Sequence, residues 1–156
     1  MNARLRPLRD DEFDAWVSAA TAGYAAGIEH DAGLSHDEAQ LKAQTDMARF
    51  VSDGSLPEGH AVFVVEDDGE AVGRLWVAER AIDGGRTALV VYEVAVEEHA
   101  RGRGLGRLAM EFAAEEAKRR GIEQVGLNVF GGNEVARNLY RSLGYREVAV
   151  WMEKAV

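Results

Sequence analysis

Cysteine is absent from the 156-residue chain, so the sequence excludes disulfide bonds and any zinc site built from thiolates. Proline occurs only twice, and no apolar run approaches the ~20 residues that a membrane-spanning helix requires. The first nine residues are basic and are followed directly by acids, which is unlike a secretory signal peptide. These features predict a cytoplasmic protein without a membrane partner.

Positive charge is also scarce, because 18 Lys and Arg residues face 27 Asp and Glu residues and leave a net charge of −9. The phosphates of nucleic acid repel an acidic protein, so we expect no nucleic-acid partner. The acidic excess lies in residues 1–96, whereas residues 97–156 carry nine acids and ten bases. The acidic part can serve solubility alone, or it can attract a cationic substrate.

The chain is long enough for one domain, residues 1–156, and its 47% share of hydrophobic residues can fill one core. The four histidines show no spacing typical of metal ligands, so no metal is expected. Apolar periodicity and turn residues predict the element order β-α-α-β-β-β-α-β-α-β. Strands are expected at 4–8, 61–66, 71–78, 91–96, 125–130 and 146–152, and helices begin near Asp10, Ser35, Leu105 and Asn133. This order predicts an α/β fold (an α+β mixed sheet) with helices on both faces.

The most informative stretch is a β-branched strand, Val91–Val96, that leads through glycines into a helical pattern starting at Leu105. Glycine lets the backbone turn tightly and lets a ligand approach it closely. The first N–H groups of a helix have no internal partner and attract anions. The stretch therefore predicts a pyrophosphate-binding site formed by Arg101, Gly102, Arg103, Gly104, Leu105, Gly106 and Arg107.

The spacing Gly104-x-Gly106-x-x-Ala109 also matches the loose dinucleotide-binding fingerprint. Five residues separate the strand from Gly102, however, whereas the fingerprint turn follows its strand closely. The next strand carries no acid at its end to hold a ribose, and the chain has no P-loop motif. A dinucleotide or nucleoside triphosphate site is therefore disfavoured.

The pattern Arg101-x-x-Gly104-x-Gly106 after a Val-Ala-Val strand resembles the acetyl-CoA motif of the GNAT N-acetyltransferase superfamily. Segments 127–133, 136–140 and 143–145 resemble the second cofactor segment of that family. The resemblance implies a mostly antiparallel sheet that splays between its fourth and fifth strands. Acetyl-CoA would enter this gap and contact Val94, Ala95, Val96, Asn133, Ala136 and Tyr140.

Two residues are candidates for acid–base catalysis. Glu93 is an acid inside the apolar run 90–96, where burial would raise its pKa and suit a general base. Alternatively, it forms an ion pair on an exposed strand face. The resemblance implies that Tyr140 protonates the departing CoA thiolate, although it can also be a core aromatic. Asn133 can bind the cofactor arm or simply cap a helix.

Glu29, His30 and His60 are weaker candidates for the base. The resemblance implies that an acetyl group passes from acetyl-CoA to the primary amine of a small molecule or peptide. Direct attack in a ternary complex is expected, because the chain has no cysteine to form an acetyl-enzyme. A strand N–H near Val94 or Ala95 would stabilise the oxyanion. A transferase for another acyl-CoA, a non-catalytic CoA-binding regulatory module and a homodimer stay open.

Overall fold

The computed structural model describes residues 2–51 and 53–156, which form one five-stranded sheet flanked by helices. Along the sheet the strands follow the order of the chain: β1 (Ala3–Pro7), β2 (His60–Asp67), β3 (Glu70–Ala81), β4 (Thr87–Val96) and β5 (Val125–Leu127). The first four strands pair antiparallel, and β4 and β5 pair parallel. The predicted mixed α/β fold is thereby confirmed.

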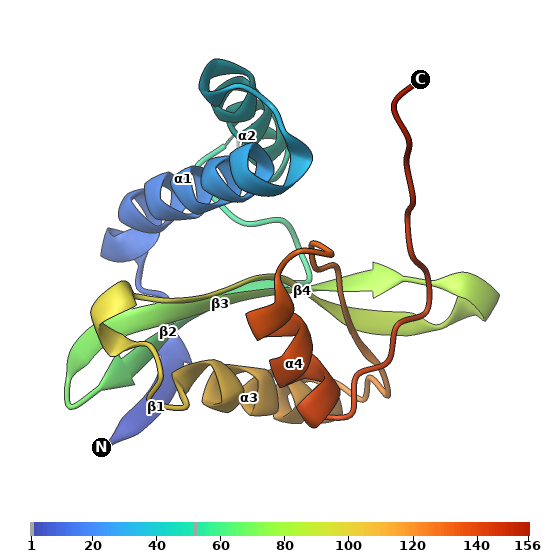
Figure 1. Cartoon of the computed structure of the whole chain (residues 1–156). Helices are drawn as coiled ribbons and strands as arrows, with labels where there is room; N and C mark the ends of the chain where they lie inside the picture. The colour runs from blue at the N-terminus through green and yellow to red at the C-terminus, as the bar shows by residue number, and fades with distance from the viewer. Residues whose placement is uncertain (1, 52) are drawn as a thin grey trace.

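Four helices cover the two faces of the sheet, with α1 and α2 on one side and α3 and α4 on the other (Figure 1). Their bounds are α1 (Phe13–Ala32), α2 (His36–Val51), α3 (Leu105–Arg119) and α4 (Glu134–Ser142). Single 3₁₀ turns occur at Asp10–Glu12, Asp83–Gly85 and Glu98–Ala100. Within the described part of the chain, no helix is long and apolar enough to span a bilayer.

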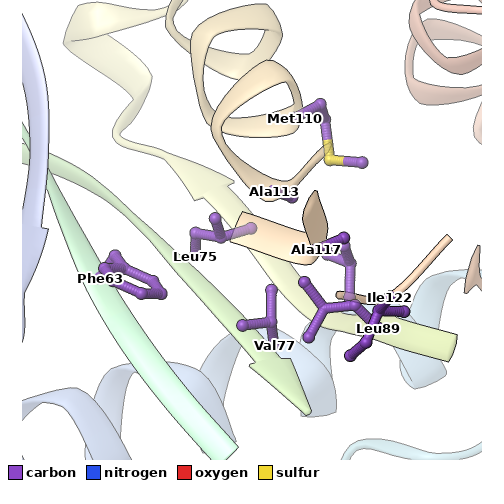
Figure 2. Close-up of a cluster of buried hydrophobic side chains, with 9 residues drawn as sticks. Phe63, Leu75, Val77, Leu89, Met110, Ala113, Ala117 and Ile122 are labelled. Atoms are coloured by element: carbon purple, nitrogen blue, oxygen red, sulfur yellow. The ribbon is translucent and has the colours of Figure 1, made fainter. Parts of the chain in front are cut away.

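Both faces of the sheet are buried, because neighbouring residues of a strand point to opposite sides. Leu75 and Val77 contribute to the cluster beneath α3, whereas Trp76 between them joins the cluster beneath α1 and α2. Figure 2 shows the first cluster, in which Met110, Ala113 and Ala117 of α3 meet residues of the sheet. Continuous apolar runs in the central strands are therefore a requirement of the three-layer arrangement.

Local signals placed several elements correctly. The capping box that was expected before α2 is present, since Ser35 N–H donates to Glu38 Oε2 (2.9 Å) and Glu38 N–H donates to Ser35 Oγ (3.3 Å). The hairpin turn between β2 and β3 holds Asp68 at φ 50° and Gly69 at φ 87°. Two successive positive φ values match the right-handed twist of the flanking strands.

The splay between the fourth and fifth strands is also present. β5 pairs with β4 only at Leu89–Val125, Val90–Gly126 and Val91–Leu127. β4 then continues to Val96 without β5 at its side, while its other edge stays paired with β3. The backbone on this edge of β4 is therefore open to hydrogen bonding with a ligand.

Two strand predictions near the C-terminus need correction. The strand expected at 125–130 ends at Leu127, and residues 146–152, expected as the closing strand, form no strand. The composition of 146–152 suits a strand, but a strand also needs a neighbour to complete its backbone hydrogen bonds. In this subunit the segment runs away from the sheet (Figure 1).

Candidate functional site

The opening between β4 and β5 continues into a cavity of about 780 Å³. The helices α1 and α2 and strand β3 line one part of it, and β4, the segment after β5 and α4 line the rest. A methyl group added to Gly27 of α1 would lie 3.5 Å from Phe130, so α1 closely approaches the segment that follows β5. Five residues predicted from the sequence share this cavity: Glu93, Val94, Ala95, Asn133 and Tyr140.

The glycine loop follows directly from the open end of β4. Gly102 and Gly104 adopt φ values of 76° and 81°, which side-chain-bearing residues rarely adopt. Gly104 is the N-cap of α3, and its carbonyl accepts the first helical hydrogen bond, from Leu108 N–H (3.0 Å). The N–H groups at 105–107 therefore precede the first helical acceptor and suit an anion.

The three arginines of the loop have different surroundings. Arg103 forms an ion pair with Asp67, whose side chain is almost completely buried at the end of β2. Arg101 Nε donates to the carbonyl of Val96 (3.1 Å), and Arg107 donates to Ser142 Oγ of α4 (2.7 Å). The arginines thus tie the loop to β2, β4 and α4 while remaining partly exposed.

Gly106 serves a packing role that the loop pattern does not reveal. A methyl group at this position would lie 3.4 Å from a methyl carbon of Leu139, so the start of α3 packs tightly against α4. This contact brings the phosphate-binding end of α3 close to the helix that carries Tyr140. Leu105 is buried in a hydrophobic cluster with Val65, Val72 and Ala109.

A bulge in β4 determines where Glu93 points. The β3–β4 register shifts between Trp76–Glu93 and Val77–Val91, so Tyr92 has no opposite residue. Val91 and Val94 pack with the α3-side core, whereas Tyr92 packs with the α1-side cluster. Glu93 follows Tyr92 to the α1 side, because its partner Arg74 also donates to the carbonyl of Ala19 in α1 (3.3 Å).

Glu93 is both ion-paired and buried, so each sequence interpretation describes it in part. Its Oε1 accepts from Arg74 Nε at 2.8 Å, and its side chain is only 16% exposed. Oε2 is buried without a hydrogen-bond partner among the described residues. Burial raises the pKa of Glu93 above its usual value, although Arg74 and, more weakly, Trp16 oppose this shift. The free Oε2 can accept a proton from a group in the cavity.

Tyr140 lies in the last turn but one of α4 and is half-buried against the α3-side core. Its ring centroid is 5.8 Å from that of Tyr145. Burial raises the pKa of the Tyr140 hydroxyl, so this group stays protonated at neutral pH and can act as an acid. The residue therefore belongs both to the edge of the core and to the cavity wall.

Asn133 caps α4, since its Oδ1 accepts from Ala136 N–H at 3.1 Å. The cap engages only the oxygen, so the side-chain NH₂ of Asn133 can still donate to a ligand in the cavity. Ala136 lies in the first turn of α4, where its own N–H is taken up by this cap.

The weaker base candidates lie elsewhere in the molecule. Glu29 and His30 are exposed near the end of α1, where Glu29 Oε2 meets His36 Nδ1 at 3.1 Å. His60 Nδ1 accepts from the indole N–H of Trp76 (3.1 Å), and its ring stacks on Tyr92. Burial lowers the pKa of His60, so this side chain is a neutral member of an aromatic cluster.

Arg74 is the site residue that the sequence analysis missed. It stands inside the apolar strand run 72–77, just as Glu93 stands inside the run 90–96. A single buried charge of each sign in two neighbouring strands signals an ion pair, because an unpaired buried charge is costly. Arg74 also binds Glu97 Oε1 at 3.2 Å, so one guanidinium joins two carboxylates beside the cavity.

A profile of the Acetyltransferase (GNAT) family matches residues 11–145, a range that extends from the start of α1 to the turn after α4. The chain belongs to this family. The match includes the glycine loop, the splayed strands and both predicted catalytic residues. GNAT membership is therefore shown by sequence and agrees with the geometry of the sheet.

Individual relatives agree with this assignment. An uncharacterized N-acetyltransferase of Bacillus subtilis, YdgE, is 27% identical over 151 residues, which cover 96% of each protein. A mycothiol acetyltransferase of Kytococcus sedentarius is 33% identical over 91% of this chain but only 44% of its own length. The crystal structure of the putative acetyltransferase YycN of Bacillus subtilis has a TM-score of 0.86 at 24% identity and 99% coverage of both chains.

Proposed function

We propose that this GNAT protein transfers the acetyl group of acetyl-CoA to a primary amine by direct attack in a ternary complex. The observation that carries the proposal is the open edge of β4 between the glycine loop and the cavity that holds Glu93 and Tyr140. One ligand can then place its phosphates at the loop and its thioester in the cavity.

The donor would bind along the open edge of β4. Backbone groups of Val94 and Val96 are oriented like those of a strand and can pair with the amide groups of the pantetheine arm. The pyrophosphate would accept hydrogen bonds from N–H groups at 102–107, supported by the charges of Arg101, Arg103 and Arg107. The side-chain NH₂ of Asn133 can donate to the same arm.

The acceptor would enter from the α1–α2 side of the cavity. Glu93 Oε2 removes a proton from the ammonium group, directly or through a water molecule, and the neutral amine attacks the thioester carbon. A backbone N–H of Val94 or Ala95 donates to the oxyanion of the tetrahedral intermediate.

Collapse of the intermediate breaks the carbon–sulfur bond and releases CoA as a thiolate. The Tyr140 hydroxyl gives its proton to the sulfur, and the products are the acetylated amine and CoA. The proton taken by Glu93 returns to solvent, and a solvent proton restores Tyr140, so the enzyme is unchanged after each cycle.

A screen of amines with a CoA-thiol assay tests the proposal. Acetyl-CoA with polyamines, aminoglycosides, amino acids and peptide N-termini should release CoA with at least one class, and initial-rate lines should intersect. Parallel lines together with an acetylated protein in mass spectrometry would replace direct attack by an acetyl-enzyme. Binding of CoA without acceptor-dependent release would instead indicate a regulatory module. Turnover restricted to other CoA esters would change the donor.

A further inference from the structure

The last 11 residues, 146–156, have the composition of a sheet strand but no place in the sheet of this subunit. Their β-branched and aromatic members favour extended structure. Five large hydrophobic side chains between 148 and 156 are exposed: Val148 (78%), Val150 (69%), Trp151 (88%), Met152 (86%) and Val156 (118%). Such a concentration of exposed apolar side chains marks a segment that is covered by something else.

The sheet ends in an edge that such a strand would complete. β5 is the last strand in the sheet order and pairs with β4 on one side only. Within the described residues, no strand lies on its other side. An uncovered edge strand presents N–H and C=O groups that readily bind another strand.

The chain is held in a path that leads the segment away from its own β5. Tyr145 N–H donates to the carbonyl of Tyr140 (3.0 Å), and the Tyr145 ring packs on the α3-side core. Glu147 then binds Arg137 (2.6 Å) and Arg141 (2.9 Å) of α4. Beyond Glu147 the chain leaves the subunit and runs alone to the C-terminus (Figure 1).

We propose that two copies of this chain exchange their C-terminal segments, so that residues 148–152 of each copy add a strand to the free β5 edge of the other. Nine extended residues after Glu147 reach about 30 Å, which is enough to cross to a neighbouring sheet. Reciprocal exchange forms a closed two-fold dimer, because each copy gives and receives the same segment. The exchanged strand would support β5 and thus the adjoining cavity wall at 127–130.

The molecular mass tests this dimer independently of any catalytic activity. The full chain should sediment at about 34 kDa, which is twice 17.0 kDa. Trp151→Glu, and separately removal of residues 148–156, should yield monomers. Leu41→Glu is the matched control, because Leu41 is an equally apolar exposed residue (67%) on α2 and should leave the dimer intact.

Cross-linking then locates the segment, since the natural chain has no cysteine to interfere. Gly126→Cys and Ala149→Cys are combined in one chain and treated with a short bis-maleimide; a side chain at Gly126 would meet open space. The proposal expects a covalent dimer on a denaturing gel. A monomeric full chain, an internally cross-linked monomer, or a dimer that survives both Trp151→Glu and the truncation would overturn it.

Discussion

At the scale of single residues, two tyrosines near the end of α4 have similar burial but different positions. Tyr140 lines the cavity and Tyr145 does not belong to its lining, although burial raises the pKa of both, for Tyr145 to about 12. A shared chemical property therefore does not decide which of them acts on a substrate, and the position relative to the cavity does.

We predict that Tyr140→Phe lowers kcat by roughly 10- to 10⁴-fold, the usual range for lost acid catalysis, while acetyl-CoA affinity is nearly kept. The reason is that only the proton for the departing thiolate is removed. Steady-state kinetics and calorimetric titration measure the two effects. Tyr145→Phe is the matched control and should keep its kcat. If Tyr140→Phe has a normal kcat, this residue is a core aromatic only.

Glu93 makes a pH-dependent prediction whose sign follows from its burial. The carboxylate is the active form of the base, and burial raises the pKa at which it becomes protonated. Activity should therefore fall as the pH decreases through this raised pKa. Glu93→Gln cannot titrate, so the acidic limb of the pH–kcat profile should disappear, together with most of the activity.

The control for this variant is Glu97→Gln, which removes the more exposed carboxylate bound to the same Arg74. It should keep the acidic limb, because Glu97 contacts Arg74 from the outer side. An unchanged acidic limb in Glu93→Gln would contradict the base assignment and would leave Glu93 as the partner of a structural ion pair.

At the scale of elements, the connection between β4 and α3 forms the phosphate site, and its conformation depends on Gly104. We predict that Gly104→Val abolishes the increase in melting temperature that acetyl-CoA or CoA causes. A β-branched residue at φ 81° is strained, and its side chain occupies the space that the phosphates approach. Differential scanning fluorimetry with and without ligand measures the effect.

Strain alone would also lower the stability of the free protein, so a control must carry the same strain elsewhere. Gly121 ends α3 at φ 70°, and a side chain there would meet open space. Gly121→Val should cost about 1–2 kcal/mol in the free protein but keep the ligand-induced shift. Loss of the shift in both variants would make the effect one of stability and not of phosphate binding.

At the scale of the whole molecule, the net charge of −9 contrasts with the cavity lining. The charged residues of the lining are Lys42, Arg49 and Arg74 with Asp46 and Glu93. Asp46 is already engaged by Lys42 (2.8 Å) and by the Tyr24 hydroxyl (3.0 Å). Attraction of a cationic acceptor would therefore come from the long-range field of the protein and not from the cavity wall.

We predict that the KM of a cationic acceptor rises with ionic strength, because salt shortens the range of this field from ~30 Å at 0.01 M to ~8 Å at 0.15 M. A diamine should show a steeper dependence than a monoamine with the same carbon chain. Equal, flat dependences for both acceptors would show that the acidic surface serves solubility and does not attract the substrate.

Most local elements could be predicted because their signals are local. The Ser35–Glu38 capping box, the Asp68–Gly69 turn and the glycines at 102 and 104 act over a few residues and look the same in any fold. The splay of β4 and β5 is different, since it was expected only from the resemblance to a family with that feature. No property of either strand alone specifies where their pairing stops.

The sequence by itself determined the alternation of helices and strands, the phosphate loop and the GNAT membership, because periodicity, turn residues and motifs lie within short stretches. Only the tertiary structure decided that a bulge turns Glu93 toward α1 and Arg74, and that Gly106 packs under Leu139. It also decided that residues 146–152 form no strand in their own subunit. These outcomes depend on contacts between distant parts of the chain, and a strand in particular requires a neighbour that its own sequence does not specify.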